Sequence, residues 1–129
     1  MRARDALLRK PWLLPFIAAL QLGATSASDA AGVLNVPRRL ASTGLYTLRR
    51  MGVEDAEGLC ILRLGRLYAT IVGTVVVVAK VRRRSVKAYT VPLELVERAQ
   101  PGVGGRLGYR VAVARAILER GERIGACWG

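Results

Sequence analysis

The sequence contains no histidine, and its 129 residues include only two cysteines, Cys60 and Cys127. Zinc sites and catalytic thiols draw on histidine and on closely spaced cysteines, so the chain offers neither a zinc site nor a Cys–His nucleophile. Both cysteines stand alone in apolar runs. We therefore expect two free, buried thiols, and a disulfide between them is the alternative.

Acidic residues are also scarce: nine stand against 21 lysines and arginines, for a net charge of +12. Such an excess is typical of proteins with a polyanionic partner, and the preponderance of arginine favours nucleic acid. A GC-rich coding sequence would also enrich arginine, but it would not explain the arrangement of the charge. Between Gly58 and Val91 there are seven basic residues and no acid.

Two short motifs resemble catalytic or nucleotide-binding elements but lack the rest of such a site. Glu54, Asp55 and Glu57 form an acidic cluster that is expected to be a solvated turn, since nothing nearby supplies a base or further ligands. The glycine-rich segment 102–108 has Leu107 where a G-x-G-x-x-G loop needs glycine, and no P-loop Lys-Ser/Thr follows. The sequence therefore predicts a protein that is not an enzyme and binds no metal or cofactor.

Residues 1–40 have the composition of a targeting leader or an N-terminal extension. Four basic groups in Met1–Lys10 precede the apolar run Trp12–Leu22, whose eleven residues fall short of the roughly 20 that span a bilayer. A secretory signal cleaved near Ser26 or Ser28 fits this pattern. So does an organellar transit peptide, which the continuing arginine- and serine-rich composition favours.

Residues 41–129 are predicted to form one all-β domain. The run Val75–Val78 is apolar on both faces, which favours a small closed five-stranded β-barrel with a basic hairpin loop. Leu93–Gln100 and Ala112–Arg120 also fit a helix. The expected strands, separated by glycine-containing or polar turns, are Leu45–Met51, Leu59–Leu64, Thr74–Val81, Val86–Val91, Val111–Leu118 and Arg123–Trp128.

The consecutive arginines 82–84 form the tip of the expected hairpin, where a tight turn lets all three reach phosphate. A solvated turn is the alternative interpretation of the same residues. The four tyrosines, at positions 46, 68, 89 and 109, either stack on unpaired bases or fill the core. The residues predicted to contact RNA are Arg63, Arg66, Lys80, Arg82, Arg83, Arg84, Lys87, Arg106, Arg110 and Arg123.

Several segments follow one another as motifs do in a known family. A Val-Glu-Asp-Ala-Glu-Gly turn at 53–58 precedes a Leu-Cys-Ile strand that ends at Leu64-Gly65. Segment 66–80 runs from Arg-Leu-Tyr-Ala into a long valine strand, and a basic loop leads into Lys87–Val91. The closing segment 117–129 contains Gly-Glu-Arg-Ile-Gly. In this order they resemble the large-subunit ribosomal protein fourteen family.

The resemblance implies a structural constituent of the large ribosomal subunit. Divergence from the family pattern, together with the leader, points to an organellar ribosome, mitochondrial or plastid, and we expect a mitochondrial one. Its partners would be large-subunit ribosomal RNA, neighbouring ribosomal proteins and small-subunit RNA across the interface, with no membrane involved. Loop arginines would neutralise backbone phosphates. The alternative is a secreted or envelope-associated basic β-domain, which cleavage near Ser26 and a Cys60–Cys127 disulfide would mark.

Overall fold

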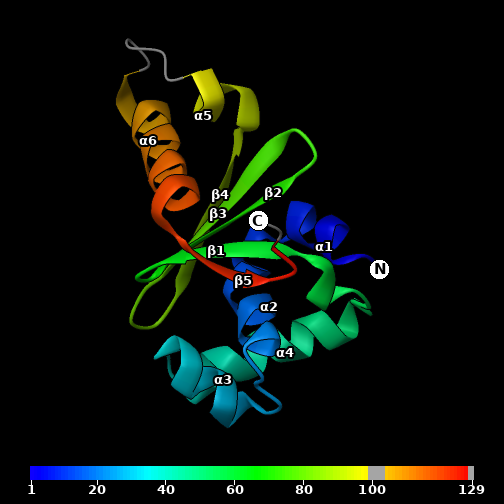
Figure 1. Ribbon diagram of the computed structural model, residues 1–129. Coiled ribbons are helices and arrows are strands. Elements are labelled where there is room, and N and C mark those ends of the chain that lie inside the picture. Colours follow the sequence, from blue (N-terminus) through cyan, green and yellow to red (C-terminus); the bar gives the residue numbers. More distant parts are fainter. Residues whose placement is uncertain (99–103, 128–129) are drawn as a thin grey trace.

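The computed structural model describes residues 1–98 and 104–127 and shows a mixed α/β fold, not the predicted all-β barrel (Figure 1). In the described residues, four α-helices and two 3-10 helices precede a run of four strands, and two α-helices and a final strand follow. In chain order the elements are α1 (Ala3–Arg9), η1 (Pro11–Leu13), α2 (Leu14–Gln21), α3 (Ala27–Leu34), α4 (Arg38–Arg50), η2 (Ala56–Gly58), β1 (Cys60–Leu64), β2 (Leu67–Val72), β3 (Val75–Val81), β4 (Val86–Pro92), α5 (Leu93–Arg98), α6 (Gly105–Arg120) and β5 (Glu122–Gly125).

The five strands form one open antiparallel sheet in the order β4-β3-β2-β1-β5. Strands β1 to β4 are joined in sequence by short turns. The final strand returns after α6 to pair with β1, with Ile61 opposite Ile124. Strands β4 and β5 are thus the two edges, and the sheet does not close on itself.

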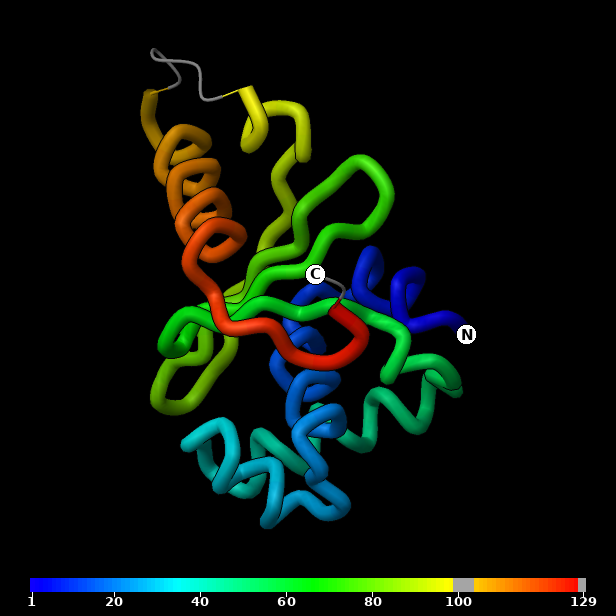
Figure 2. The backbone as a smooth tube through the Cα atoms, in the orientation of Figure 1, coloured from blue at the N-terminus to red at the C-terminus, as the bar shows by residue number. Residues whose placement is uncertain are grey.

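Both faces of strand β3 are buried although the sheet does not close into a barrel. Val75, Val77, Ala79 and Val81 belong to or pack against the core on the side of the N-terminal helices, whereas Val76 and Val78 belong to the core under α6. Because helices cover both faces of the sheet, both rows of side chains are buried (Figure 2). The expectation that both faces of this strand are covered was correct. The cover comes from two layers of helices, and the expected closure into a barrel was wrong.

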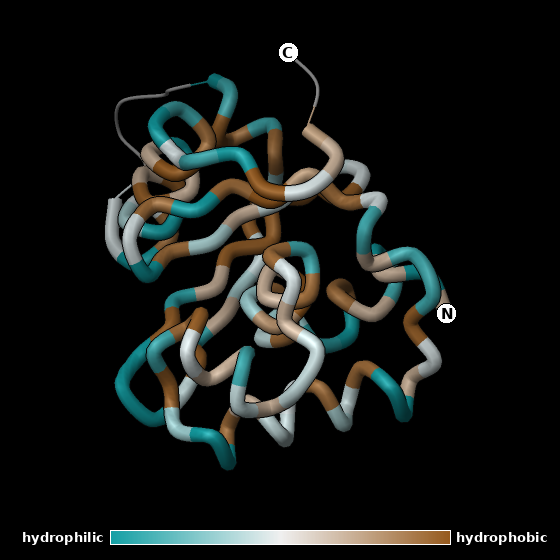
Figure 3. The backbone as a smooth tube through the Cα atoms, turned by 60° about the horizontal axis from the view of Figure 1, so that its bottom comes forward, coloured by the Kyte–Doolittle hydropathy of each residue, from teal (hydrophilic) through white to brown (hydrophobic). Residues whose placement is uncertain are grey.

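The segment predicted to be a leader supplies a large share of the first core. Leu7, Leu13, Leu14, Phe16 and Ile17 are fully buried. Hydrophobic residues follow the strands between the helical layers, and hydrophilic ones gather on outer turns (Figure 3). Whether residues 1–40 also act as a targeting signal stays a prediction. In the described part of the chain, no helix is both long and apolar enough to cross a bilayer.

Two of the predicted strands are helices. Leu45–Met51 lies mostly within α4, where Ala41, Leu45 and Leu48 are buried at helical spacing. Val111–Leu118 lies within α6, where Val111, Ala114 and Ile117 are buried at the same spacing. A window of seven or eight residues rich in Leu, Val and Ile is too short to distinguish the helical period of 3.6 residues from the strand period of two. For this reason both strand predictions were wrong.

The other strand predictions agree better with the structure. The hairpin predicted at Thr74–Val81 and Val86–Val91 is confirmed as β3 and β4, and Leu59–Leu64 is confirmed as β1. Strand β2 was not predicted. Of Arg123–Trp128, residues 123–125 lie in β5, and Trp128 lies outside the described residues. The helical alternatives are confirmed for both segments: Leu93–Gln100 over α5, up to Arg98, and Ala112–Arg120 within α6.

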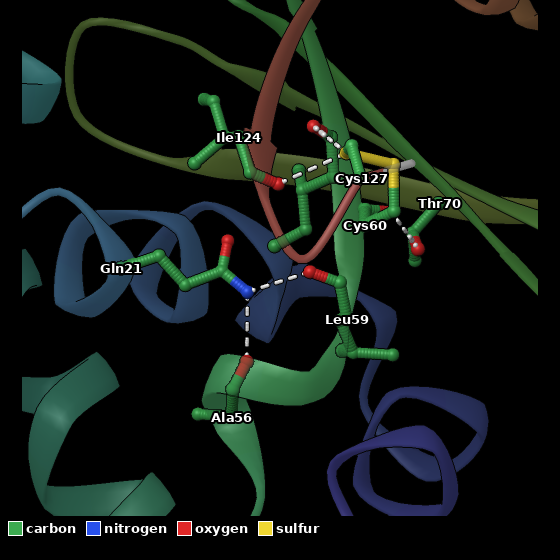
Figure 4. The surroundings of a disulfide bond; sticks show 8 residues. Gln21, Ala56, Leu59, Cys60, Thr70, Ile124 and Cys127 are labelled. Carbon is green, nitrogen blue, oxygen red and sulfur yellow. Dashed lines mark hydrogen bonds between the residues drawn. A yellow bond between two sulfur atoms is a disulfide. The ribbon is translucent and has the colours of Figure 1, made fainter. Parts of the chain in front are cut away.

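Cys60 and Cys127 form a disulfide, so the expectation of two free thiols was wrong. The bond ties the start of β1 to the chain just beyond β5 (Figure 4). Close by, the side-chain amide of Gln21 donates to the carbonyls of Ala56 and Leu59 at 2.7 and 2.8 Å. These contacts hold helix α2 against the segment that enters the sheet.

Candidate nucleic-acid interface

A recess of about 420 Å³ lies between helix α6 and the hairpin of β3 and β4. It is built from three parts of the chain: the sheet surface, the turn between β3 and β4, and the first half of α6. Of the described residues that line it, none is acidic. They are Leu67, Lys80, Arg82, Lys87, Ala88, Tyr89, Arg106, Tyr109, Arg110 and Val113, and we call this recess the basic groove.

Strand alternation brings two lysines together on the floor of the basic groove. Lys80 follows Val76 and Val78 on the face of β3 that α6 covers, and it stands directly opposite Lys87 of β4. Both side chains are exposed. Like charges directly opposite one another destabilise a sheet. An anion bound between the two ammonium groups would relieve this repulsion.

Helix α6 contributes the other wall of the basic groove. Arg106 and Arg110 lie one helical turn apart, and the guanidinium carbon of Arg110 lies 4.6 Å from the centroid of the Tyr89 ring. A cation placed over an aromatic face in this way is held by the ring's quadrupole. The pair fixes Arg110 at the recess with its donors available to a ligand.

Two tyrosines give the basic groove an aromatic component. Tyr89 is half-buried; this burial raises the pKa of its phenol, and the nearby Arg110 charge only partly opposes the rise. The phenol therefore stays neutral well above physiological pH. Tyr109 is 67% exposed on α6. Exposed or half-exposed aromatic rings beside cations are typical of sites where bases stack and phosphates pair.

The structure brings together five of the cations predicted to contact RNA: Lys80, Arg82, Lys87, Arg106 and Arg110. The other five lie elsewhere. Arg83 and Arg84 are on the exposed hairpin turn, and Arg123 is on β5, at the opposite edge of the sheet.

Arg63 and Arg66 are engaged within the protein. Arg63 pairs with Glu122 at 3.0 Å, and this hydrogen bond raises the pKa of its guanidinium. Arg66 donates from Nε to the carbonyl of Val81 at 2.8 Å, and from Nη2 to the carbonyls of Asn35 and Arg82. These contacts use guanidinium N–H groups of two residues that the sequence alone assigned to RNA contact.

A second recess lies on the other side of the hairpin turn. It has a volume of about 480 Å³ and is lined by Pro37, Arg39, Leu40, Thr43 and Arg84. The β3–β4 turn therefore stands between the basic groove, which Arg82 lines, and the start of helix α4, beside Arg84.

The acidic cluster has a structural role. In the acidic cluster, the Asp55 carboxylate accepts a hydrogen bond from the backbone N–H of Ala3 at 2.6 Å, which ties it to the start of α1. Of the glycine-rich segment 102–108, residues 102 and 103 lie outside the described residues, and α6 begins at Gly105. Over residues 1–98 and 104–127, Asp, Glu and Cys side chains form no cluster of three or more that could hold a metal ion.

The sequence interpretation missed cations that lie before residue 41 or in the region assigned to a strand. Arg38, Arg39, Arg49 and Arg50 all belong to helix α4. The spacing of Ala41, Leu45 and Leu48 was the signal that could have revealed an amphipathic helix there. It was missed because the boundary at residue 40 divided the segment.

Comparison with known proteins assigns no family. No family model, no curated protein and no solved structure matches this chain.

Proposed function

We propose that the protein binds RNA, without catalysis, through the basic groove. The observation that carries the proposal is that five cationic side chains from two strands, a turn and a helix line one recess together with two tyrosines, and that no described residue of the lining is acidic. A ligand with regularly spaced negative charge and flat rings matches this lining. A single RNA strand has both features.

In this binding mode the lysines and arginines pair with backbone phosphates and release condensed counterions. Each neutralised phosphate contributes about −0.7 to the slope of log affinity against log salt for a single strand. Tyr109 is exposed and offers a ring face for unpaired bases, whereas Arg110 covers a face of the Tyr89 ring. Base stacking on aromatic side chains tolerates many sequences. Affinity would depend more on charge and single-strandedness than on base identity.

Residence in the large subunit of a mitochondrial ribosome, with ribosomal RNA and ribosomal proteins as partners, stays a prediction from the family resemblance. The resemblance implied a closed barrel, and the sheet is open, so the RNA-binding proposal rests on the basic groove alone. Co-sedimentation of the tagged protein with large subunits, scored by mass spectrometry, tests the ribosomal prediction directly.

The disulfide favours a second candidate, the secreted or envelope-associated basic domain. Disulfides persist mainly in oxidising compartments, and the Cys60–Cys127 bond is the feature expected of that alternative. Cell fractionation followed by maleimide labelling separates the two candidates. Labelled, free thiols in an organellar or cytosolic fraction would oppose the secreted candidate, and an unlabelled protein outside the cytoplasm would support it.

The groove is tested by fluorescence anisotropy with a 16-nucleotide poly-U RNA and the full chain. The variant carrying Lys80→Gln and Arg110→Gln should bind about tenfold or more weakly at 50 mM salt, with a salt slope shallower by roughly one to two units. The control carries Arg9→Gln and Lys10→Gln, which remove the same charge from exposed residues outside the groove. An equal loss of RNA affinity in both variants would show that binding depends on net charge and not on the groove, and it would overturn the proposal.

A further inference from the structure

Helices α3 and α4 form a helix-turn-helix unit. Helix α3 begins after Ser26, whose hydroxyl accepts a hydrogen bond from the backbone N–H of Asp29 at 3.1 Å. It ends at Leu34, and Asn35 is its C-cap. Asn35 has φ 54°, a left-handed conformation that reverses the chain. Val36 and Pro37 complete a three-residue turn before α4 starts at Arg38. A turn of three or four residues between two helices is one feature of this motif.

The unit is held by a buried core of its own side chains and by helix α2. Ala30 and Leu34 of α3, Val36 of the turn, and Leu45 of α4 are buried. Gly44 lets α4 approach α2 so closely that a Cβ atom there would lie 2.4 Å from the Phe16 ring. Three packed helices therefore position α4 rigidly at one end of the molecule, away from α6 (Figure 1).

The outer face of α4 is polar, cationic and free of acids. Tyr46 is 63% exposed, and none of the thirteen residues of the helix is Asp or Glu. The exposed residues recur at intervals of three and four, so they line one side of the helix. They are Arg38, Arg39, Ser42, Thr43, Tyr46, Arg49 and Arg50.

The arginine turn of β3–β4 extends this surface. Arg66 donates from one Nη2 to the carbonyl of Asn35 and to that of Arg82, both at 3.2 Å, so it ties the helix-turn-helix turn to the hairpin. Arg84 shares the second recess with Arg39 and Thr43. The α3–α4 unit and the hairpin turn lie at the same end of the molecule (Figures 1 and 2).

We propose that this surface binds double-stranded DNA, with α4 lying in the major groove and Arg83 and Arg84 contacting the flanking phosphates. In helix-turn-helix proteins the second helix occupies the major groove and its N-terminal residues meet base edges; here those residues are Arg38, Arg39, Ser42 and Thr43. B-form DNA admits a helix into that groove, whereas the major groove of an RNA duplex is too narrow. The duplex site is separate from the basic groove and does not depend on the RNA proposal.

Three probes of matched length test the assignment with the full chain: a 20-base-pair DNA duplex of random sequence, the same duplex as RNA, and poly-U RNA. The protein should bind the DNA duplex about tenfold or more tightly than the RNA duplex at 100 mM salt. Equal affinity for the two duplexes would overturn the proposal, because it would show binding to phosphate charge without use of the major groove.

Variants then locate the site. Arg38→Gln with Arg39→Gln, or Arg83→Ser with Arg84→Ser, should each weaken DNA-duplex binding about tenfold while changing poly-U binding less than about twofold. All four residues are exposed, so the thermal melting of each variant should match the parent. The groove variant Lys80→Gln, Arg110→Gln should show the reverse pattern. If the α4 variant binds the DNA duplex as the parent does, the inference fails, whatever the outcome for RNA.

Discussion

Lys80 and Lys87 stand directly opposite each other on β3 and β4, on the face of the sheet that α6 covers. An arrangement of two like charges costs stability in the free protein, and a bound anion relieves that cost. Lys87→Glu replaces the repulsion with an attractive cross-strand pair. It should raise the free energy of unfolding by about 0.5 kcal/mol, measured by urea denaturation.

The same substitution should weaken poly-U binding by about tenfold or more at low salt, because it removes one positive charge and adds a negative one in the basic groove. The matched variant Lys87→Gln should show a smaller effect of the same sign on both stability and affinity. A Lys87→Glu protein that is more stable and binds RNA as the parent does would show that the lysine pair has no role in binding.

The ring of Phe16 on α2 lies against Gly44 of α4. Phe16 is fully buried, so Phe16→Ala should lower the free energy of unfolding by about 3–5 kcal/mol. Gly44→Ala should also destabilise, by about 1–3 kcal/mol, because the added methyl collides with the ring. Combining Gly44→Ala with Phe16→Leu should recover part of that loss. Strictly additive effects would contradict a direct contact.

The Cys60–Cys127 disulfide joins residues 67 positions apart and so restricts the unfolded chain. In the chain-entropy model, a loop of this size corresponds to about 4 kcal/mol. Adding dithiothreitol should therefore lower the midpoint of thermal unfolding markedly. The double variant Cys60→Ala, Cys127→Ala should melt near the reduced parent and should not respond to the reductant; a response there would point to another cause.

Val76 tests the second core, under α6. The residue is fully buried, so Val76→Asp would place an unpaired carboxylate among apolar side chains and should cost more than about 3 kcal/mol, enough to unfold a marginal domain. Thr90→Asp, at an exposed position on neighbouring β4, is the control and should remain folded by circular dichroism. Similar unfolding in both variants would contradict the placement of Val76 under α6.

Local sequence patterns were sufficient to predict the β3–β4 hairpin. Two β-branched runs separated by a short polar turn specify a hairpin through contacts between near neighbours in the chain. The same reasoning failed at residues 45–51 and 111–118, where leucine and valine suit either a helix or a strand. There the choice depends on which surface the side chains meet, the Phe16 ring for α4 and the sheet for α6.

The basic groove could be predicted only in part. Lys80 and Lys87 belong to one hairpin, so their proximity follows from register alone. Arg106 and Arg110 reach the same recess because α6 packs across that hairpin, and Arg63, with similar sequence surroundings, is instead paired with Glu122. A single charged residue does not signal whether it will meet an acid or a ligand, since its partner is distant in sequence.

The amino-acid sequence by itself determined the excess of positive charge, the absence of histidine chemistry and the presence of a strand apolar on both faces, because these are properties of composition and local pattern. Tertiary structure alone decided that helices would cover that strand, that residues 3–36 would enter the core, and that Cys60 would meet Cys127. The physical reason is that burial and cross-linking depend on surfaces brought together from distant parts of the chain, and no local window contains both partners.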